Sequence, residues 1–405
     1  MNLHSATVTR RRFLAALGGG VAAVVLAACG IERSAQPTPS ASAPPSATAS
    51  PTDTPSPQPS PTPGPSLRDR IAQMLLVGFR GLTVEAAGEI AADIHDRNLG
   101  GIVLFDTDQP THSKVRNVES AAQLTALIDG LQALAPTPLL VAIDEEGGLV
   151  ARLDQRHGFP ATISAADLGA RGDVTFTRQA GERIAETLAS VGVNLNLAPV
   201  VDLNVNPTNP IIGALGRSFS ADPSVVTTQA EAFVEGHRSV GVRTTLKHFP
   251  GHGSSTSDSH LGVVDVTNTW SPIELDPFRN LVHDRLADAV LTAHVFNSKL
   301  DPEHPATLSA PTITGILRQE LGWDGVVISD DMQMGAIRDA YGYADAVRLA
   351  ILAGVDLLTI AQQQVYEPGI VASTIDLIEG FVNDGSLTEA RIDESYQRIQ
   401  ALKLR

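Results

Sequence analysis

The segment from residue 247 to 260 concentrates side chains that can do chemistry. It reads KHFPGHGSSTSDSH and holds three of the eleven histidines of the chain, one lysine and one aspartate. It directly follows the β-branched run Val242–Leu246, so we expect it to start at the end of a strand and continue as a loop. Three interpretations compete for it: a metal site, an acid/base site, and a solvated loop without chemistry.

A metal site would need the histidines to converge on one ion. His248 and His252 are four residues apart, but the proline and glycines around them exclude a helix that would place both on one face. An extended loop could still gather four ligands around a zinc ion, namely His248, His252, Asp258 and His260. No second cluster of ligands supports this interpretation, so we predict no metal at the site.

The acid/base interpretation rests on Asp258 and His260. Residues i and i+2 of an extended segment point to the same side, so the carboxylate can hold one imidazole nitrogen while Ser259 points away. A neighbouring carboxylate raises the pKa of a histidine and keeps a proton available for a leaving oxygen. The tripeptide alone is a weak signal, because most such histidines are merely exposed, but its place in a loop after a strand strengthens it.

A second acidic group follows the apolar run Val326–Ser329. Two adjacent carboxylates, Asp330 and Asp331, cannot both point the same way from the end of a buried strand. We predict that Asp330 faces the site, where it needs a nearby cation or a raised pKa, and that Asp331 is structural. The alternative is that one of the two caps a helix starting near Met332.

Two further motifs offer groups that bind hydroxyls. In Ala142–Gly148 the two glycines let the backbone approach a ligand, and Asp144 together with Arg152 can bind a polar substrate. A turn with a surface ion pair would explain the same residues. Arg217, in the sequence Gly-Arg-Ser-Phe, means little alone.

Eight apolar runs alternate with amphipathic stretches over residues 67–405. Near-continuous apolar strands are typical of a parallel sheet covered on both faces, and eight of them over this length predict an α/β fold with one (β/α)8 TIM-type barrel. A doubly wound open sheet is the alternative, but no glycine-rich dinucleotide turn follows the first strand. The expected strands are Met74–Phe79, Gly101–Phe105, Leu139–Ile143, Val193–Leu197, Arg243–Lys247, Ala289–Ala293, Val326–Ser329 and Val355–Ile360, and the expected helices include Ala121–Ala133, Thr177–Val191, Val225–Val240, Pro277–Arg285 and Ile313–Leu321.

Ionisable residues end most of these strands. In a barrel the C-terminal ends of the strands form one mouth, where catalysis takes place. We therefore predict that these groups share one pocket. They are Asp106, Asp144, Lys247, His248, His294 and Asp330, with Asp202 shortly after the fourth strand.

The first 66 residues do not have the composition of a folded domain. A twin-arginine motif, TRRRFL, precedes an apolar segment, Ala15–Ala28, that is too short to span a membrane, so residues 1–28 are predicted to be a signal peptide. The sequence LAAC at its end is similar to a bacterial lipobox, which would make Cys29 the lipidated N-terminus; the alternative is a free thiol. Residues 31–66 hold eleven of the 26 prolines, so 29–66 are predicted to be a disordered tether.

The charge of the remaining chain excludes one class of partner. Residues 67–405 keep 25 of the 29 basic and 43 of the 45 acidic residues, which gives a net charge of −18. Nucleic acid needs a basic face, so we expect no nucleic-acid partner. No further low-complexity segment interrupts 67–405, which are predicted to form one domain and to act as a monomer.

Together these motifs resemble glycoside hydrolase family three, and within it the single-barrel β-N-acetylhexosaminidase branch. The resemblance covers nearly all of residues 67–361. It rests on an ordered set: IDEEGG…R, LAPVVDLN, GRSF, KHFPGHG…DSH, HPATLS, LRQELGWDGVVISDDMQM and AGVDLL. It implies a glycosidase domain, 67–405, whose acid/base sits on a barrel loop, whereas two-domain β-glucosidase relatives take a glutamate from a second domain.

The functional residues of the family fall on matching positions of this sequence. The resemblance implies that Asp330 is the nucleophile, that His260 is the acid/base, and that Asp258 is the partner of His260. It further implies that the sugar hydroxyls are bound by Asp144, Arg152, Arg217, Lys247 and His248.

Three positions depart from the family pattern, which usually has Gln at Glu145, Arg at Leu149 and Asp at Ser254. The first two bear on sugar specificity, and the third on how the loop 247–262 closes. None removes a catalytic group that the resemblance implies.

The resemblance implies a retaining, exo-acting glycosidase that removes terminal β-linked N-acetylglucosamine from peptidoglycan- or chitin-derived glycans without a metal or organic cofactor. There are three alternatives. The first is a β-N-acetylglucosaminide phosphorylase, the second is another β-glycosidase of the same family, and the third is a catalytically inactive, tethered glycan-binding lipoprotein. The signal peptide and lipobox predict an exported protein, on the cell surface or in the periplasm, anchored in the membrane through Cys29.

Overall fold

Eight short apolar runs form eight parallel strands in the structure, a computed structural model that describes residues 64–259 and 262–405. Every residue of these eight strands except Arg243 is buried, because helices cover the outside of the ring and side chains fill its interior. Each strand lies where the sequence predicts one. They are β1 (Leu75–Gly78), β2 (Gly101–Leu104), β3 (Leu140–Ile143), β6 (Leu195–Asn196), β7 (Arg243–Phe249), β9 (Ala289–Thr292), β11 (Val326–Ile328) and β12 (Leu358–Ile360).

The strands close into a barrel. Their order is β11-β9-β7-β6-β3-β2-β1-β12, and the two end strands meet at a parallel bridge between Ile328 and Leu357. There the N–H of Ser329 donates to the carbonyl of Leu357 at 2.9 Å, and the N–H of Leu357 donates to that of Val327 at 3.0 Å. The predicted (β/α)8 barrel is therefore confirmed, and the alternative of an open doubly wound sheet is wrong.

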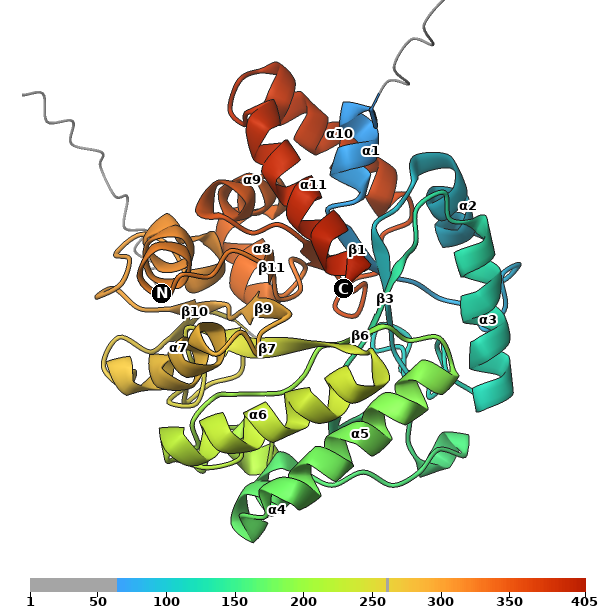
Figure 1. Ribbon diagram of the computed structural model, residues 1–405. Helices are drawn as coiled ribbons and strands as arrows, with labels where there is room; N and C mark the ends of the chain where they lie inside the picture. The colour runs from blue at the N-terminus through green and yellow to red at the C-terminus, as the bar shows by residue number, and fades with distance from the viewer. Residues whose placement is uncertain (1–63, 260–261) are drawn as a thin grey trace, which may run out of the picture. The chain divides into compact units, whose positions relative to one another are not determined.

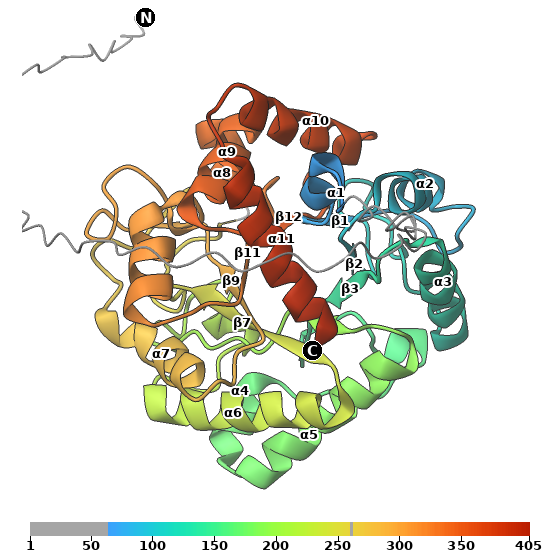
Figure 2. The ribbon, with the colours of Figure 1, turned by 45° about the horizontal axis from the view of Figure 1, so that its top comes forward.

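Helices surround the ring of strands (Figures 1 and 2). The five helices expected from the sequence are present, with ends that shift by up to three residues; the last of them, η5, is a π-helix. The helices are α1 (Leu67–Ala72), α2 (Gly88–Arg97), α3 (Ala121–Leu134), α4 (Ala165–Arg171), α5 (Val174–Ser190), α6 (Pro223–Val240), α7 (Asp276–His283), η5 (Pro311–Glu320), α8 (Gly335–Tyr341), α9 (Tyr343–Ala353), α10 (Ile370–Asn383) and α11 (Glu389–Leu404).

Shorter elements decorate the loops. The antiparallel pair of β4 (Glu145–Gly147) and β5 (Val150–Ala151) forms a hairpin directly after β3, and β8 (Val264–Asp265) pairs in parallel with β10 (Val295–Phe296). Single 3₁₀ turns occur at η1 (Gln155–His157), η2 (Gly213–Leu215), η3 (Pro272–Leu275) and η4 (Ala306–Leu308).

Residues at the two ends of α6 fix where this helix begins and ends, and so where strand β7 starts. Asp222 caps its N-terminus by accepting the N–H of Ser224, and Pro223 occupies the first helical turn. At the other end Gly241 adopts a left-handed conformation with φ of +86°, which ends the helix. The chain then enters β7 two residues later, at Arg243, and this strand delivers the histidine-rich segment to the mouth of the barrel.

Helix α11 lies across the N-terminal end of the barrel, opposite the mouth (Figure 2). Arg243, which begins β7, donates to the carbonyl oxygens of Leu402 and Lys403 at 2.6 and 2.8 Å. The ammonium group of Lys403 donates to the side-chain oxygen of Gln73, just before β1, at 2.7 Å. Burial lowers the pKa of Lys403 to about 7. The helix thus ties together strands that are far apart in sequence.

A buried aspartate anchors the same helix. Asp356, fully buried before β12, accepts hydrogen bonds from the guanidinium groups of Arg391 at 3.3 Å and Arg398 at 3.1 Å, both on α11. Arg318 of η5 lies 2.6 Å away, and the hydroxyl of Ser395 donates at 3.0 Å. One carboxylate therefore joins two helices to the base of the barrel.

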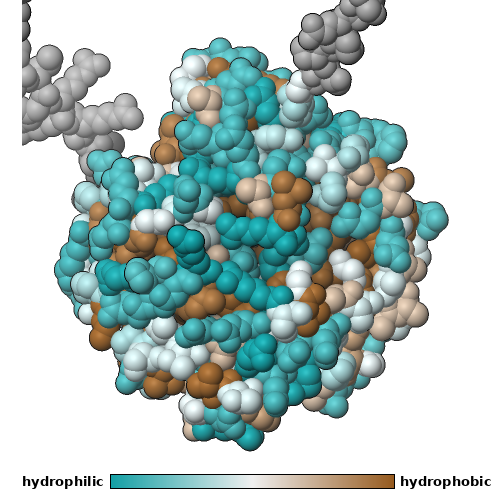
Figure 3. All heavy atoms as spheres, in the orientation of Figure 1, coloured by the Kyte–Doolittle hydropathy of each residue, from teal (hydrophilic) through white to brown (hydrophobic). Residues whose placement is uncertain are grey.

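The surface is mostly polar. Figure 3 shows hydrophilic side chains over most of one face, with hydrophobic ones in small groups between them. Among the described residues, no helix has both the length and the apolar composition needed to cross a membrane. The predicted signal peptide (1–28), Cys29 and the tether up to residue 63 lie outside the described residues.

Candidate active site

The C-terminal ends of the strands surround a pocket of about 400 Å³. In barrels of this kind the catalytic residues lie at this end. Seven of the eight residues predicted for the site line the pocket, and the eighth, His260, lies outside the described residues. The seven are Asp144, Arg152, Arg217, Lys247, His248, Asp258 and Asp330.

The ionisable residues at the strand ends form two layers, which corrects the prediction that all of them share the pocket. Those that line it are Asp144, Lys247, His248 and Asp330. Asp106, Asp202 and His294 do not line it. Asp202 binds His248, and Nε2 of His294 lies 2.9 Å from the carbonyl oxygen of Asp331, whereas Asp106 binds Arg156 at 2.8 Å and lies 4.0 Å from Arg152.

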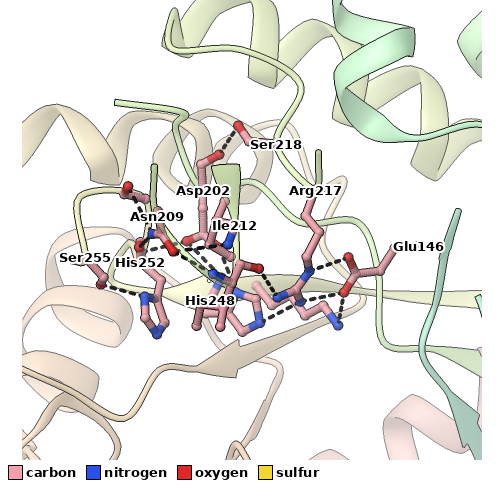
Figure 4. Close-up of polar contacts among 12 residues, drawn as sticks. Glu146, Asp202, Asn209, Ile212, Arg217, Ser218, His248, His252 and Ser255 are labelled. Atoms are coloured by element: carbon pink, nitrogen blue, oxygen red, sulfur yellow. Dashed lines mark hydrogen bonds and ion pairs between the residues drawn. The ribbon is translucent and has the colours of Figure 1, made fainter. Parts of the chain in front are cut away.

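A buried ion network forms one wall. Nζ of Lys247 lies 2.6 Å from Asp144 and 2.7 Å from Glu146. Arg217 donates to both oxygens of Glu146, through Nε and Nη2, at 2.7 Å each (Figure 4). The sequence analysis missed Glu146. Its position two residues after Asp144 was the available signal, because alternate residues of a strand face the same side.

The four groups of this network keep each other charged. Burial raises the pKa of Asp144, but Lys247 and Arg152 outweigh it and lower that pKa. Burial also opposes the ionisation of Glu146, yet Arg217 and Lys247 hold its pKa far below the usual range. The pKa values of Lys247 and Arg217 are raised, because the two carboxylates outweigh burial. Two anions and two cations therefore face the pocket as a satisfied buried network.

Asp202 orients the imidazole of His248. Nδ1 of His248 lies 2.6 Å from Oδ2 of Asp202, whose Oδ1 accepts the main-chain N–H of His248 at 3.2 Å (Figure 4). Burial raises the pKa of Asp202, but His248 outweighs it and lowers that pKa. Nε2 lies 3.4 Å from Nη2 of Arg217, which can only donate. Because a carboxylate only accepts, Nδ1 of His248 donates to Asp202.

His252 is a second pocket histidine that the site prediction did not include. Its Nδ1 lies 2.6 Å from Oγ of Ser255, and its Nε2 lies 3.3 Å from Oγ of Ser259. Burial, helped by the nearby His248, lowers the pKa of His252 to about 4, so the ring is neutral. The prediction that Ser259 points away is wrong: this side chain is buried and lines the pocket. Turns and bends replace an extended chain at 253–259, so simple alternation does not apply.

The loop that begins at Pro250 is firmly seated. Oδ1 of Asp202 accepts the N–H of His252 at 2.7 Å. The amide of Asn209 donates to the carbonyl oxygens of His252 and Gly253 at 2.8 and 3.2 Å. A Cβ atom at Gly253 would lie 1.7 Å from the carbonyl oxygen of Leu203, so only glycine permits this approach. These contacts fix the start of the segment that leads to Asp258.

The two aspartates after β11 have different surroundings. Oδ1 of Asp330 accepts the N–H of Asp331 at 2.8 Å, and the side chain of Asp330 is half-buried in the pocket. Oδ1 of Asp331 accepts the N–H groups of Gln333 and Ala361 at 3.1 and 2.9 Å, as a structural role requires, and Asp331 also lines the pocket. Helix α8 begins only at Gly335 and has no side-chain cap, so the alternative of a helix cap is wrong.

Arg152 crosses from the hairpin toward the pocket. Nη2 lies 3.7 Å from Asp144, and Nη1 lies 4.0 Å from Asp106. Its Nε is buried and has no hydrogen-bond partner among the described residues. The ion pair that the sequence allowed is present, but it lines the pocket instead of lying on the open surface.

Comparison with known proteins identifies the family. Residues 66–402 match the glycosyl hydrolase family 3 N terminal domain over most of the chain. The chain belongs to glycosyl hydrolase family 3. The family 3 membership agrees with the barrel and with the order of the motifs along the sequence.

Three similar proteins differ in how much of their length this chain covers. Beta-hexosaminidase A of Pseudoalteromonas piscicida is 34% identical over 339 residues, which are 78% of this chain and 55% of the relative. A β-N-acetylglucosaminidase structure from Paenibacillus sp. str. FPU-7 is 36% identical with a TM-score of 0.76, over 84% of this chain and 62% of that one. A β-N-acetylhexosaminidase structure from Beutenbergia cavernae is 30% identical with a TM-score of 0.75, over 84% and 99%. The chain thus spans little more than half of the first two relatives and nearly all of the third.

The three departures from the family 3 pattern occupy different places. Leu149 lies at the turn of the β4–β5 hairpin and is 75% exposed, whereas Glu145 is 2% exposed inside the protein. Ser254 is buried, and its Oγ has no hydrogen-bond partner among the described residues. Its N–H lies 3.3 Å from Oε2 of Glu274, whose pKa burial raises to about 7.

A metal site was the first alternative for the histidine-rich segment. Among the described residues, which omit His260, no group of three or more His, Cys, Asp and Glu side chains is arranged to hold a metal ion. The two described histidines of the segment are turned to other partners, His248 to Asp202 and His252 to two serines.

Proposed function

We propose that the protein is a retaining, exo-acting β-N-acetylglucosaminidase that releases terminal β-linked N-acetylglucosamine from glycans. One observation carries the proposal: Asp330 after β11 and Asp258 in the loop after β7 open on the same pocket. The names of the family 3 relatives support the sugar, and the pocket volume of about 400 Å³ suits a single terminal ring with its substituents.

The reaction would proceed in two displacements. The carboxylate of Asp330 attacks the anomeric carbon, the bond from that carbon to the leaving oxygen breaks, and the leaving oxygen takes a proton from His260. A covalent glycosyl-aspartate results. His260, now neutral, accepts a proton from water, the hydroxide oxygen bonds to the anomeric carbon, and Asp330 leaves as a free carboxylate. Asp258 supports the protonated imidazole while it exists.

The ion network would bind the hydroxyl groups of the sugar. Asp144, Arg152, Lys247, His248 and Arg217 line the pocket. Hydrogen bonds in which one partner is charged are about twice as strong as neutral ones, so a ring of fixed charges can hold hydroxyls in one orientation. The remaining lone pairs of Asp144 are suitable acceptors, because the hydrogen bond from Lys247 uses only Oδ1.

The charges of the pocket favour water over phosphate as the acceptor. Among the described residues, four carboxyl side chains line it, whereas two of the three lysine and arginine residues there, Arg217 and Lys247, already bind carboxylates of the same wall. An inorganic anion would therefore approach a surface with excess negative charge. We expect hydrolysis, with phosphorolysis as the outcome to be tested against it.

Product analysis tests the function. We expect the protein to release free N-acetylglucosamine from an aryl N-acetyl-β-glucosaminide, with no sugar phosphate when phosphate is added. Asp330→Asn should lower kcat by at least about a thousandfold, because the nucleophile is lost. Asp339→Asn, at an exposed aspartate of α8, is the control. Sugar phosphate as the main product would show a phosphorylase, and binding of glycans without any turnover would show the inactive glycan-binding alternative.

A further inference from the structure

Glu145 stands between two pocket acids but faces the other way. Asp144 lines the active-site pocket and Glu146 belongs to its ion network, whereas the side chain of Glu145 is 2% exposed and lines a separate cavity of about 240 Å³. This follows from the alternation of side chains along a strand. The cavity lies between the hairpin, residues 160–163 and α5, and most of its lining is apolar.

The carboxyl group of Glu145 joins the two arms of the hairpin. Oε2 accepts the main-chain N–H groups of Arg152 and Leu153 at 2.8 and 2.9 Å. The main chain of Glu145 is itself held by the amide of Asn196 on β6, which accepts from its N–H at 3.0 Å and donates to its carbonyl oxygen at 2.9 Å. The backbone of Arg152 is therefore fixed to the barrel wall through Glu145.

The second oxygen of Glu145 favours a neutral side chain. Oε1 is buried and has no hydrogen-bond partner among the described residues. An ionised carboxylate would lose the hydration of this oxygen without gaining a hydrogen bond. In a neutral carboxyl, the carbonyl oxygen still accepts the N–H groups of Arg152 and Leu153. Burial raises the pKa of Glu145 to about 8, against the opposing effect of the N–H groups of Leu153 and Arg152.

The titratable groups around Glu145 come from its own hairpin, with the residues that follow it, and from α5 and α6. On its own hairpin the guanidinium of Arg152 lowers the pKa of Glu145, and Asp154 raises it. Arg183 and Glu186 of α5 line the cavity opposite. Behind Asn196 lies His237 of α6, whose pKa burial lowers to about 4, so it adds no charge. No cation among these neighbours makes a hydrogen bond or ion pair with the carboxyl of Glu145 in the described structure.

We propose that Glu145 is a positioning residue: its protonated carboxyl holds Arg152 in place beside Asp144, and its ionisation in alkaline solution weakens binding of the sugar. The inference rests on the proposed function, in which Arg152 binds the sugar. Ionised Glu145 adds a third negative charge to the run 144–146 and competes for the guanidinium of Arg152, whose Nε has no hydrogen-bond partner among the described residues.

Glu145→Gln is the decisive variant. Glutamine keeps the carbonyl oxygen for both N–H groups but does not ionise. Glu186→Gln removes the same charge from the exposed opposite wall of the cavity and serves as the control. The measurement is kcat and KM for an aryl N-acetyl-β-glucosaminide between about pH 5 and 9.5, and Glu145→Ala, which loses the acceptor, is measured beside it.

We expect KM of the wild type and of Glu186→Gln to rise several-fold above about pH 8, where Glu145 ionises, with a smaller change in kcat. In Glu145→Gln this rise should be absent, and in Glu145→Ala KM should be high at every pH. If Glu145→Gln reproduces the wild-type profile, or is as impaired as Glu145→Ala throughout, the positioning role is wrong.

Thermal unfolding gives a readout that needs no substrate. The pKa of Glu145 is higher in the folded than in the unfolded chain, so its contribution to stability is present in acid and lost as pH rises toward about 8. The Tm of Glu145→Gln minus that of the wild type should therefore grow from acid to alkaline pH, and a constant difference would contradict the inference. If the wild type turns over no glycoside in any buffer, the proposed function fails, while the Tm comparison still decides whether Glu145 titrates as inferred.

Discussion

Each charged side chain of the pocket is held by a partner that fixes its direction. Lys247 bridges Asp144 and Glu146, and Asp202 holds His248 from behind. Such preorganised charges need no rearrangement when charge develops at the sugar, which is how electrostatic stabilisation lowers a barrier. Asp330, the proposed nucleophile, lies beside these groups, and its carboxyl accepts the main-chain N–H of Asp331.

The role proposed for His260 leads to a dependence on the leaving group. His260→Ala should lower kcat/KM by about 10²–10⁴-fold for a disaccharide, whose leaving oxygen needs a proton, and far less for an aryl glycoside with an acidic leaving group. Steady-state kinetics on both substrates checks this. His283→Ala, at an exposed histidine of α7, is the control. Equal losses on both substrates would mean that His260 is not the acid.

At the residue scale, the sequence predicted the pocket residues that directly follow strands and missed those that reach the site through a hairpin or a turn. Asp144, Lys247 and Asp330 follow apolar runs, so the barrel geometry alone brings them to the mouth. Glu146 and His252 owe their place to a hairpin and to a turn. Local turns of this kind are set by tertiary contacts, such as the seat of Gly253 on Leu203, that no sequence spacing reveals.

At the scale of elements, strands were easier to predict than the ends of helices. A buried parallel strand must be apolar along its whole length, and this leaves a strong pattern. The helix expected near Met332 starts at Gly335. The carboxylate of Asp331 accepts the N–H groups of Gln333 and Ala361 and therefore does not cap the N-terminus of this helix. The pairing of β4 with β5 was not predicted, since three- and two-residue strands are too short for a periodic signal.

The attachment of α11 depends on Asp356. Asp356→Ala would leave the guanidinium groups of Arg318, Arg391 and Arg398 without their shared anion, and breaking a buried pair in this way costs about 3–5 kcal/mol. Chemical denaturation should show this loss, with KM unchanged because the pocket lies at the other end of the barrel. Asp345→Ala, which breaks an exposed pair with Arg348, should cost less than about 1 kcal/mol. Similar effects of both substitutions would contradict the anchoring role.

At the scale of the whole molecule, the proposal is a tethered enzyme. The folded part carries a net charge of −18, and the tether predicted for 29–66 would let it work away from the membrane. The tether was predicted from the amino-acid composition of its segment, whereas the barrel was predicted from the alternation of apolar runs with amphipathic stretches. These are separate signals, because a proline-rich segment has no core to bury.

Anchoring through Cys29 can be tested in cells that make the protein. Cys29→Ala should move the protein from the membrane fraction to the soluble fraction, because the lipid on this cysteine is the proposed anchor. Ser40→Ala, in the same segment, is the control. Immunoblots of the two fractions and incorporation of a labelled fatty acid measure the outcome. Wild-type protein that is soluble and unlabelled would rule out the anchor.

Helix α11 has a consequence for biosynthesis. Its residues, 389–404, leave the ribosome after all eight strands, yet they bind the starts of β7, β1 and β12. The base of the ring therefore stays unsealed until α11 has been synthesised. A nascent chain stalled before α11 should be far more sensitive to protease than one that contains α11, and an export route that accepts folded cargo would receive the protein only after α11 has been made.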